Sequence, residues 1–446
     1  MAEQMMQGKA SEIAAKQTIP TGYKQTEAGV IPEDWEQVAL GHIAEVRMCK
    51  RIFSDQTTES GAIPFFKIGT FGGQPDAYIS ISRYNEFKAK YSFPEKGDVL
   101  ISAAGTLGKT VVYDGAPAYF QDSNIVWLEV NKNKILNEYL RHYYKVISWA
   151  SPEGSTISRL YNAIIRATVI NLPSLPEQTA IANVLSDSDA LIDALEQLIA
   201  KKQAIKTATM QQLLTGRTRL PQFALRSDGT PKGYKSSELG QIPEDWEVKT
   251  LRDMLAESPK YGINAPAVEL SRDTPAYIRI TDINNDGYYR PTEKVGVRSV
   301  FSEQYILHVN DIVLARTGAS VGKSYLYNAD DGQLVYAGFL IKISPLQGIL
   351  NSSYLFQFMK TKKYWDWVLV NSMRSGQPGI NSAEFASMLI PTPSINEQTA
   401  IATILSDMDS ELNALEQKLA KARDVKQGMM QQLLTGRIRL PLEVVA

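Results

Sequence analysis

The chain has 446 residues, of which 44% are hydrophobic and 21% are charged, and its formal net charge is −1. This composition is ordinary for a soluble globular protein, and the length predicts two to four domains that can each bury a core. The single cysteine, Cys49, excludes a disulfide framework within the chain, and three widely spaced histidines argue against a zinc cluster.

The N-terminal segment and the overall charge bear on the protein's cellular location and on its capacity to bind DNA. Residues 1–17 lack the apolar core of a signal peptide, and no apolar run approaches the ~18 residues of a membrane helix. We therefore expect a cytoplasmic protein with no membrane contact. Because the net charge is close to zero, any DNA binding must rest on local surfaces or on a partner that adds positive charge.

The first part of the chain predicts an N-terminal arm, residues 1–20, followed by an α+β domain, residues 21–174. The connector "GYKQTEAGVIPEDWE" opens the domain, and we expect Trp35 to pack this connector onto the rest. The segment "EYLRHYYKVIS" predicts a helix. Short β-branched and aromatic runs between turn residues predict strands at "IPFFKIGTF", "DVLISA", "TVVYDG" and "NIVWLEV".

A long helix is predicted next, over residues 175–218. Its apolar residues recur at alternating steps of four and three, as they do on one face of a helix. Pro176 and Glu177 suit a helix start, and Gly216 suits a C-terminal cap. About 38 helical residues at 1.5 Å each give a rod of roughly 57 Å.

The second half of the chain repeats this order. A polar connector and a second α+β domain occupy residues 219–394, with Trp246 in the place of Trp35. The predicted strands are "AYIRITDI", "DIVLART", "SYLYNA" and "LIKIS", and "SYLFQFMKTKKYWDWVL" predicts one helix. A second long helix over residues 395–438 and a tail of residues 439–446 complete the chain.

The two halves are a tandem duplication with a pseudo-two-fold internal repeat. Segments of 45 residues that begin at Glu177 and Glu397 are identical at 28 positions without a gap, whereas the domains before them diverge strongly. A single chain built in this way can imitate a two-fold dimer.

Neither long helix can bury its apolar stripe alone, so we expect the two to pack as an antiparallel coiled coil with one α/β domain near each end. The alternative is that each helix lies on its own domain. A second apolar row, at Val184, Leu191, Leu198 and Ile205, is a candidate surface for a partner protein. The residues expected in the helix pairing are Ile181, Leu185, Ile192, Leu195, Ile199, Ile401, Leu405, Met408, Leu412, Leu415 and Leu419.

Two strings, "LISAAGTLGKT" and "LARTGASVGKS", suggest phosphate-binding loops at first sight. That motif needs a glycine five positions before its Gly-Lys pair, where this chain has Ala103 and Thr317. It also needs a helix after the lysine, whereas "TVVYDGAP" predicts a strand and a turn. Both strings are therefore expected to be tight hairpin turns whose lysines, Lys109 and Lys323, point outward.

Other catalytic patterns are weak. Pro75-Asp76 followed by Glu86-Phe87-Lys88 fits a short pattern of metal-dependent nucleases, in which carboxylates hold magnesium. The second half has no equivalent, and we expect these residues to form a solvated charged turn instead. The sequence contains no Asn/Asp-Pro-Pro-aromatic motif of a base methyltransferase, and no nucleophile–histidine arrangement stands out.

Several motifs occur once in each half of the chain, in the same order. They are "IPEDWE", the paired segments "LPSLPEQTAIANVLSD" and "IPTPSINEQTAIATILSD", and the segments "MQQLLTGRTRLP" and "MQQLLTGRIRLP" that follow them. Through these motifs nearly the whole chain beyond the first 20 residues resembles the specificity (S) subunit of type I restriction–modification systems. The two glycine-lysine strings are similar to ones inside the target-recognition domains of that family.

This resemblance implies a non-catalytic chain in which each target-recognition domain reads one half of a split double-stranded DNA site. The long helices then set the spacing between the halves. Two methyltransferase (modification) subunits dock on the assembly, and restriction or motor subunits join it. No cofactor is expected in this chain, since S-adenosylmethionine, ATP and Mg would bind the partner subunits.

Candidate DNA contacts are polar or basic residues at predicted turns and strand ends, because phosphates attract Lys and Arg and base edges bind Arg, Asn, Gln, Ser or Thr. In the first domain they are Lys67, Thr70, Arg83, Lys109, Ser123, Asn124 and Arg159. In the second they are Arg279, Thr281, Arg316, Lys323, Ser324, Arg374 and Gln377.

Two other functions stay open at this point. A metal-dependent endonuclease predicts magnesium-dependent cleavage that is lost on the substitution Asp76→Ala. A coiled-coil adaptor that ignores DNA predicts no sequence-dependent binding even with methyltransferase partners present.

Overall fold

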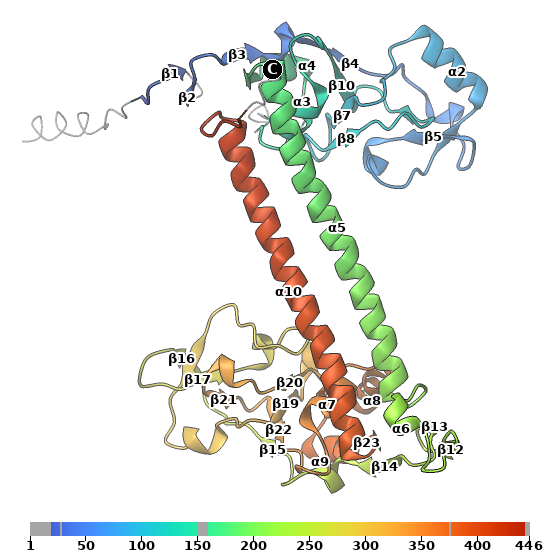
Figure 1. Ribbon diagram of the computed structural model, residues 1–446, viewed down its shortest axis with the longest axis vertical. Coiled ribbons are helices and arrows are strands. Elements are labelled where there is room, and N and C mark those ends of the chain that lie inside the picture. The colour runs from blue at the N-terminus through green and yellow to red at the C-terminus, as the bar shows by residue number, and fades with distance from the viewer. Residues whose placement is uncertain (1–18, 27–28, 148, 150–158, 374–375, 442–446) are drawn as a thin grey trace, which may run out of the picture. The chain divides into compact units, whose positions relative to one another are not determined.

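The computed structural model describes residues 19–26, 29–147, 149, 159–373 and 376–441. The chain divides into two compact units, residues 1–195 with 418–446 and residues 196–417. Each unit holds one mixed helix-and-strand domain and a part of both long helices, so the predicted α+β class is confirmed (Figure 1). In the described part of the chain, no helix is long and apolar enough to cross a membrane.

The domain of the first unit is built around a four-stranded antiparallel sheet in the order β4-β10-β7-β8. A second sheet, β6-β5-β9, contains the parallel pair β5 and β9. The strands are β1 Tyr23–Thr26, β2 Gly29–Pro32, β3 Glu36–Ala39, β4 Ala44–Arg47, β5 Ile63–Phe66, β6 Tyr78–Ile79, β7 Val99–Ser102, β8 Thr110–Val112, β9 Tyr119–Phe120, β10 Ile125–Val130 and β11 Val169–Leu172. The short helices are α2 Ile81–Lys90, α3 Asn137–Tyr143 and α4 Asn162–Ala167.

Both faces of this four-stranded sheet are covered. Successive side chains of a strand point to opposite faces, so Val99 and Ile101 of β7 enter one apolar cluster and Leu100 enters another. The first cluster also contains Ile181 and Leu185 from the start of a long helix. The sheet is therefore attached to the helix through one face, and its other face packs on the aromatic core around β5 and β9.

The second unit repeats this topology. Its sheet β15-β22-β19-β20 corresponds to β4-β10-β7-β8, and β17 pairs in parallel with β21 as β5 pairs with β9. The strands are β12 Tyr234–Ser237, β13 Gly240–Pro243, β14 Glu247–Thr250, β15 Lys260–Tyr261, β16 Ala267–Glu269, β17 Ala276–Ile278, β18 Val295–Val297, β19 Ile312–Ala315, β20 Ser324–Leu326, β21 Leu334–Tyr336, β22 Leu340–Ile343 and β23 Leu389–Thr392. The short helices are α6 Pro221–Ala224, α7 Ser352–Phe358, α8 Lys362–Ser372 and α9 Ser382–Ala386.

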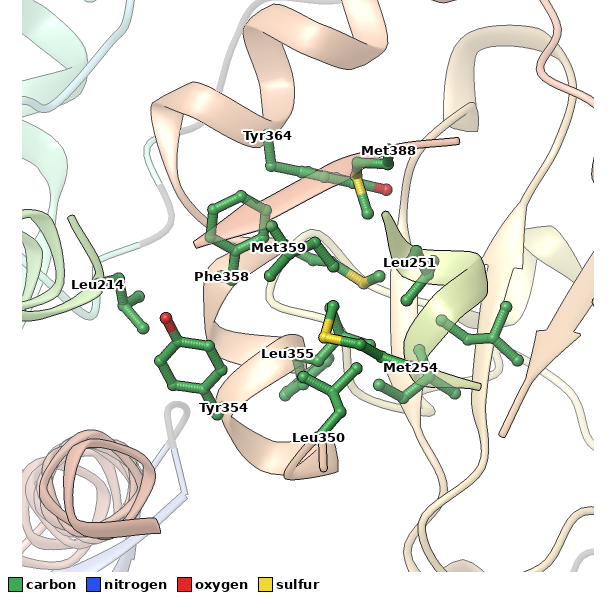
Figure 2. Packing of buried hydrophobic residues seen from close by; sticks show 14 of the residues in the cluster. Leu214, Leu251, Met254, Leu350, Tyr354, Leu355, Phe358, Met359, Tyr364 and Met388 are labelled. Atoms are coloured by element: carbon green, nitrogen blue, oxygen red, sulfur yellow. The ribbon is translucent and has the colours of Figure 1, made fainter. Parts of the chain in front are cut away.

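The core of the second unit joins the domain to the end of a long helix. Figure 2 shows Leu214 beside Tyr354 of α7, and Leu355, Phe358 and Met359 belong to the same cluster. The Tyr354 hydroxyl donates to the carbonyl oxygen of Pro391 at 2.8 Å, which satisfies its polar end inside the core.

The two long helices are α5, Leu175–Leu214, and α10, Ile395–Leu433. They pack antiparallel in each unit. In the first unit the beginning of α5 lies against the end of α10, where the hydroxyl of Ser188 approaches the sulfur of Met429 at 3.9 Å. In the second unit the end of α5 lies against the beginning of α10, where Lys202 pairs with Glu411 at 2.7 Å. The expected antiparallel helix pair is therefore confirmed, and the alternative of two separate helices is wrong.

The predicted pairing residues lie on the covered side of both helices. All are buried or half-buried, and the deepest, at 0–1% exposure, are Ile181, Leu185, Ile401 and Leu405. These four also belong to the domain cores. Near each helix start the apolar stripe therefore packs against both the other long helix and the core of a domain. In the second apolar row, Leu191, Leu198 and Ile205 are exposed.

A buried joint at the start of each long helix explains why the connector, the helix start and the helix end recur together. In the first unit Trp35 is fully buried and donates its indole N–H to Glu177 at 3.0 Å. Arg439 donates to the same carboxylate and to Asp34. Gly436 has a φ of +71°, and a Cβ at this position would lie 2.4 Å from Pro32. The connector is therefore fastened to the long helices as well as to its domain.

The second unit contains the same joint. Trp246 donates to Glu397 at 3.2 Å, and Arg219 donates to Glu397 and Asp245. The next residue in each helix, Gln178 or Gln398, is fully buried and binds backbone atoms ahead of α3 or α7.

Two sequence expectations for local structure are wrong. The helix predicted over "SYLFQFMKTKKYWDWVL" is two helices, α7 and α8, because the Thr361 hydroxyl accepts from the backbone N–H of Tyr364 and caps a new start. The segment with Glu86 and Lys88, expected as a charged turn, is helix α2, whose first turn is capped by the hydroxyl of Ser80.

The joint predicts a large stability difference between two arginine substitutions. Arg219→Ala leaves the Glu397 carboxylate, 2% exposed, without its ion-pair partner, and losses of about 3–5 kcal/mol are typical for such a change. We expect the thermal unfolding midpoint to fall by several degrees. Arg226→Ala breaks the more exposed pair with Glu244 and should cost about 1 kcal/mol or less. Equal midpoints for the two variants would contradict this role of the joint.

Candidate nucleic-acid interface

In the first unit, four segments that are distant in sequence meet at one end of the sheet, and we call them the first loop cluster: residues 67–71, 103–109, 121–124 and 159–160. The loop between β7 and β8 is held by its neighbours. Ala103 donates its backbone N–H to Asn124 at 2.7 Å, Leu160 donates to Ala103 at 2.8 Å, and Ala104 forms a β-bridge with Arg159.

The 3-10 turn over Ile68–Thr70 joins the same cluster. Ile68 donates its backbone N–H to the side-chain oxygen of Gln121 at 2.9 Å, and the Thr70 hydroxyl accepts from the backbone N–H of Lys67. Ser123 has a φ of +54°, which is uncommon for a residue other than glycine. Such strained backbone is concentrated at functional sites.

The second unit assembles the corresponding segments, residues 279–282, 316–323, 337–339 and 377–380, into a second loop cluster. Arg316 donates its backbone N–H to Phe339 at 3.1 Å and accepts from the N–H of Ile380 at 2.9 Å. Thr317 forms a β-bridge with Gly379. Ala337 donates to Ile278 at 3.1 Å, as Gln121 donates to Phe66 at 2.9 Å in the first unit. The two clusters share a backbone plan.

The glycine-lysine strings are hairpin loops, as predicted, although wider than a tight turn. Residues 103–109 connect β7 to β8, and residues 316–323 connect β19 to β20. The two glycines before the lysines have φ of +75° and +87°. A Cβ on Gly108 would lie 2.3 Å from the Trp149 indole, and one on Gly322 would lie 2.7 Å from Val368. Both glycines are thus required by backbone conformation and by close packing.

The charges of the first cluster are unequally compensated. The Lys67 ammonium lies 2.9 Å from Asp76, so it is paired. Lys109 is exposed, and its ammonium donates to the carbonyl oxygen of Phe71 at 2.5 Å. Arg159 donates to the carbonyl oxygen of Ser123 at 3.4 Å. Within the described residues Lys109 and Arg159 form no ion pair with a carboxylate.

In the second cluster Arg316 has a distinct environment. Its guanidinium lies 5.1 Å from the ring centroid of Tyr261 and 5.8 Å from that of Phe339, and its Nε donates to Gly338 at 3.0 Å. No carboxylate of the described residues pairs with it. Arg279, by contrast, forms two hydrogen bonds to the buried carboxylate of Asp282. The guanidinium of Arg316 is therefore held in one orientation without a described carboxylate partner. The guanidinium of Arg279, in contrast, is bonded to an aspartate of its own turn.

Several sequence candidates lie elsewhere or are less accessible than expected. Arg83 lies on α2 and donates to the carbonyl oxygen of Gln56, outside the cluster. Ser324 is buried in β20. Lys323 is half-buried at the wall of a groove of about 990 Å³, so it does not point freely outward, and the ammonium of Lys109 is likewise held by Phe71.

Of the remaining second-domain candidates, Thr281 is exposed in its turn, and Gln377 is exposed beside Gly318 of the hairpin loop. Arg374 lies outside the described residues.

Three residues of the clusters, or in contact with them, were not predicted from the sequence. Gln121 holds the 3-10 turn, and Tyr261 and Phe339 hold Arg316, yet none is basic or part of a recognised motif. Phe339 carried one usable signal, since it is an aromatic residue next to glycine in "AGFL" and its side chain is 56% exposed.

The nuclease pattern is not assembled into a metal site. Asp76 pairs with Lys67, and Glu86 pairs with Lys90 on the same helix. Among the residues that the structure describes, no group of three or more His, Cys, Asp or Glu side chains could hold a metal ion.

Comparison with known proteins gives a consistent assignment. The family model described as type I restriction modification DNA specificity domain matches residues 32–207 and residues 243–422. A Haemophilus influenzae protein named as a type I restriction enzyme specificity subunit is 51% identical over 160 residues, which is 36% of this chain and 42% of that relative.

Two further comparisons span nearly the whole chain. The Methanocaldococcus jannaschii type I restriction enzyme MjaVIII specificity subunit is 24% identical over 94% of this chain and 96% of its own length. The crystal structure of the S subunit of a type I restriction–modification system from M. genitalium covers 90% of this chain and 96% of that one. Its TM-score is 0.58 at 15% identity, which establishes a shared fold.

None of these comparisons favours the nuclease or the adaptor. Because the family model matches two segments that together make up more than half of the chain, the protein belongs to the type I restriction modification DNA specificity domain family and carries two copies of that domain.

Proposed function

We propose that this chain is the sequence-specific DNA-recognition subunit of a type I restriction–modification complex, in which each domain reads one half of a bipartite asymmetric site. The observation that carries this proposal is the pair of loop clusters. They share a backbone plan and present different side chains, with Lys109 and Arg159 in one and Arg316 and Gln377 in the other. Unlike side chains on a common backbone plan would select unlike half-sites.

The division of labour follows the family. The chain supplies recognition, and methyltransferase subunits would bind S-adenosylmethionine and methylate an adenine in each half-site. Restriction subunits would bring the ATP and Mg that translocation and cleavage need, and the complex would act in the cytoplasm. The exposed apolar residues Leu191, Leu198 and Ile205 on α5 support docking of a methyltransferase, since apolar residues repeated on a helix face favour a partner helix.

The helix pair would set the distance between the two half-sites. Half-sites on one face of B-DNA lie about 34 Å apart for each helical turn. Because α5 and α10 are continuous over 40 and 39 residues, they can hold a defined spacing, with neither helix able to shorten without losing backbone hydrogen bonds.

The function predicts one methylation pattern. The chain would be expressed with the methyltransferase subunit encoded beside it, and methyladenine would be mapped across the host genome. We expect one split motif with two different halves and a fixed spacer. A continuous motif would argue against the proposal, as would an absence of methylation when both subunits are present and soluble.

We predict that the ammonium of Lys109 contacts a DNA phosphate. Lys109→Ala should weaken binding to specific and non-specific DNA alike and leave the methylated motif unchanged, because phosphates carry no sequence information. The slope of log K against log salt should become shallower by about 0.9 for one lost contact. Lys24→Ala is the control, since Lys24 also donates to a backbone carbonyl, that of Glu33, but lies in the connector. An altered motif in the Lys109 variant would show that this residue reads a base.

We predict that the guanidinium of Arg316 contacts a base in one half-site. A clamped guanidinium can bind guanine through two hydrogen bonds worth about 1–3 kcal/mol of discrimination. Arg316→Ala should therefore relax one position of the half-site read by the second domain, while the other half-site keeps its sequence. Methylation mapping checks both halves together. Arg272→Ala, the same charge change in an exposed turn outside the cluster, should leave the motif intact.

A further inference from the structure

One aspartate in each unit lies where three elements meet. In the second unit Asp409 of α10 forms an ion pair with Lys206 of α5. Its other carboxylate oxygen accepts from the side-chain amide of Gln357 in α7 at 2.8 Å and lies 3.6 Å from the Lys360 ammonium, just beyond α7. One carboxylate thus links both long helices to the recognition domain.

The first unit contains the corresponding arrangement with the helices exchanged. Asp189 of α5 forms an ion pair with Lys426 of α10. It also lies 3.3 Å from Arg141 in α3 and 3.2 Å from Lys145 just beyond α3. The side chain of His142 is fully buried, and its ring contacts the Ser186 hydroxyl at 3.1 Å.

The contacts of Asp409 are largely buried, although its partners border the groove of about 990 Å³. Those of Asp189 are more exposed, since the side chains of Asp189, Arg141 and Lys145 are 23%, 31% and 37% exposed. The side chains of Lys206, Asp409 and Lys360 are 8%, 16% and 16% exposed. Burial raises the pKa of the Asp409 carboxyl, but the charges and hydrogen bonds of Lys360, Lys206 and Gln357 outweigh it, and the net shift is downward. Burial lowers the pKa of Lys360 to about 8, although Asp409 opposes this shift. Neutralising one member of such a group leaves the others charged and partly desolvated, which is unfavourable.

The contacts of Asp409 can form in one register of α5 against α10. A slip of one residue moves a side chain about 1.5 Å along an α-helix and rotates it by about 100°. Asp409 would then lose Lys206, Gln357 and Lys360 together. Buried polar groups between helices are known to specify register in this way. An apolar stripe of similar residues, such as the one beside Asp409, discriminates less between neighbouring registers.

We propose that Asp189 and Asp409 are positioning residues for DNA recognition. In its own unit each fixes the register of α5 against α10 and the orientation of the recognition domain on these helices, so together they determine which spacer length the protein accepts. The inference rests on the proposed function, because it assumes a split site.

Each positioning residue has a matched control two positions earlier in the same helix. Asp187 and Asp407 are exposed, and they occupy equivalent positions in α5 and α10. Asp409→Asn and Asp407→Asn therefore make the same change in charge and volume on one helix. Lys206→Met is the second test variant, since it removes the α5 partner and leaves Asp409 bonded to the domain.

The experiment maps methyladenine for the wild type, Asp409→Asn, Lys206→Met and Asp407→Asn, each co-expressed with the methyltransferase subunit. Both test variants should methylate sites whose spacer is one base pair shorter or longer, at about tenfold or more above the wild-type level, with the bases of both half-sites unchanged. Asp407→Asn should keep the wild-type spacer. Loss of stability alone would reduce methylation at all sites without broadening the spacer.

A single unchanged spacer in both test variants, at any level of methylation, would overturn the inference and leave the proposed function intact. So would equal broadening in the Asp407 control. A wild-type chain that directs methylation to no split motif would overturn the proposed function itself, and the inference with it.

Discussion

A buried carboxylate with two fixed donors anchors the structure of each unit. Glu177 accepts from the Trp35 indole and from Arg439, and Glu397 accepts from Trp246 and Arg219. Each carboxylate begins a long helix, where negative charge is favourable. Each tryptophan comes from a connector and each arginine from the far end of the other long helix. One charge therefore unites three segments, and this accounts for the joint repetition of "IPEDWE", "EQTAIA" and the segments "TGRTRLP" and "TGRIRLP" in the sequence.

The recognition domains depend on this anchoring because their sheets are attached to the helices through one face. The residues of β7 and β19 that point to the helix side pack with Leu185 or Leu405, and those that point away pack with the aromatic cores. The loop clusters emerge at the ends of the same strands. Their backbone plan is thus set by a buried sheet that both domains share, while the exposed side chains on the loops are free to differ. A shared buried sheet with variable loop side chains suits a protein that must read two unlike half-sites.

Part of the site could be anticipated from sequence and part could not. The hairpin loops with Lys109 and Lys323 were expected, because glycines between alternating apolar runs favour a turn. The aromatic contacts of Arg316 were not, because Tyr261 and Phe339 come from strand ends far along the chain. Ser324 looked like a polar turn residue and is buried in β20. The break between α7 and α8 was missed although Thr361, a residue type favoured at helix starts, lies in the sequence at the start of α8.

The duplication, the two long helices, their apolar stripes and the family resemblance can all be identified in the amino-acid sequence. These features are periodic or repeated, so local pattern is sufficient to reveal them. Which charged side chains have an oppositely charged partner became clear in the folded structure. Lys67 and Arg279 pair with carboxylates, whereas Arg316 has no carboxylate partner among the residues that the structure describes. Asp189 and Asp409 join three elements, while Asp187 and Asp407 are exposed. The reason is physical, because the ionic environment of a side chain depends on neighbours that the fold brings from distant positions, and an aspartate two residues away has the same local sequence signal.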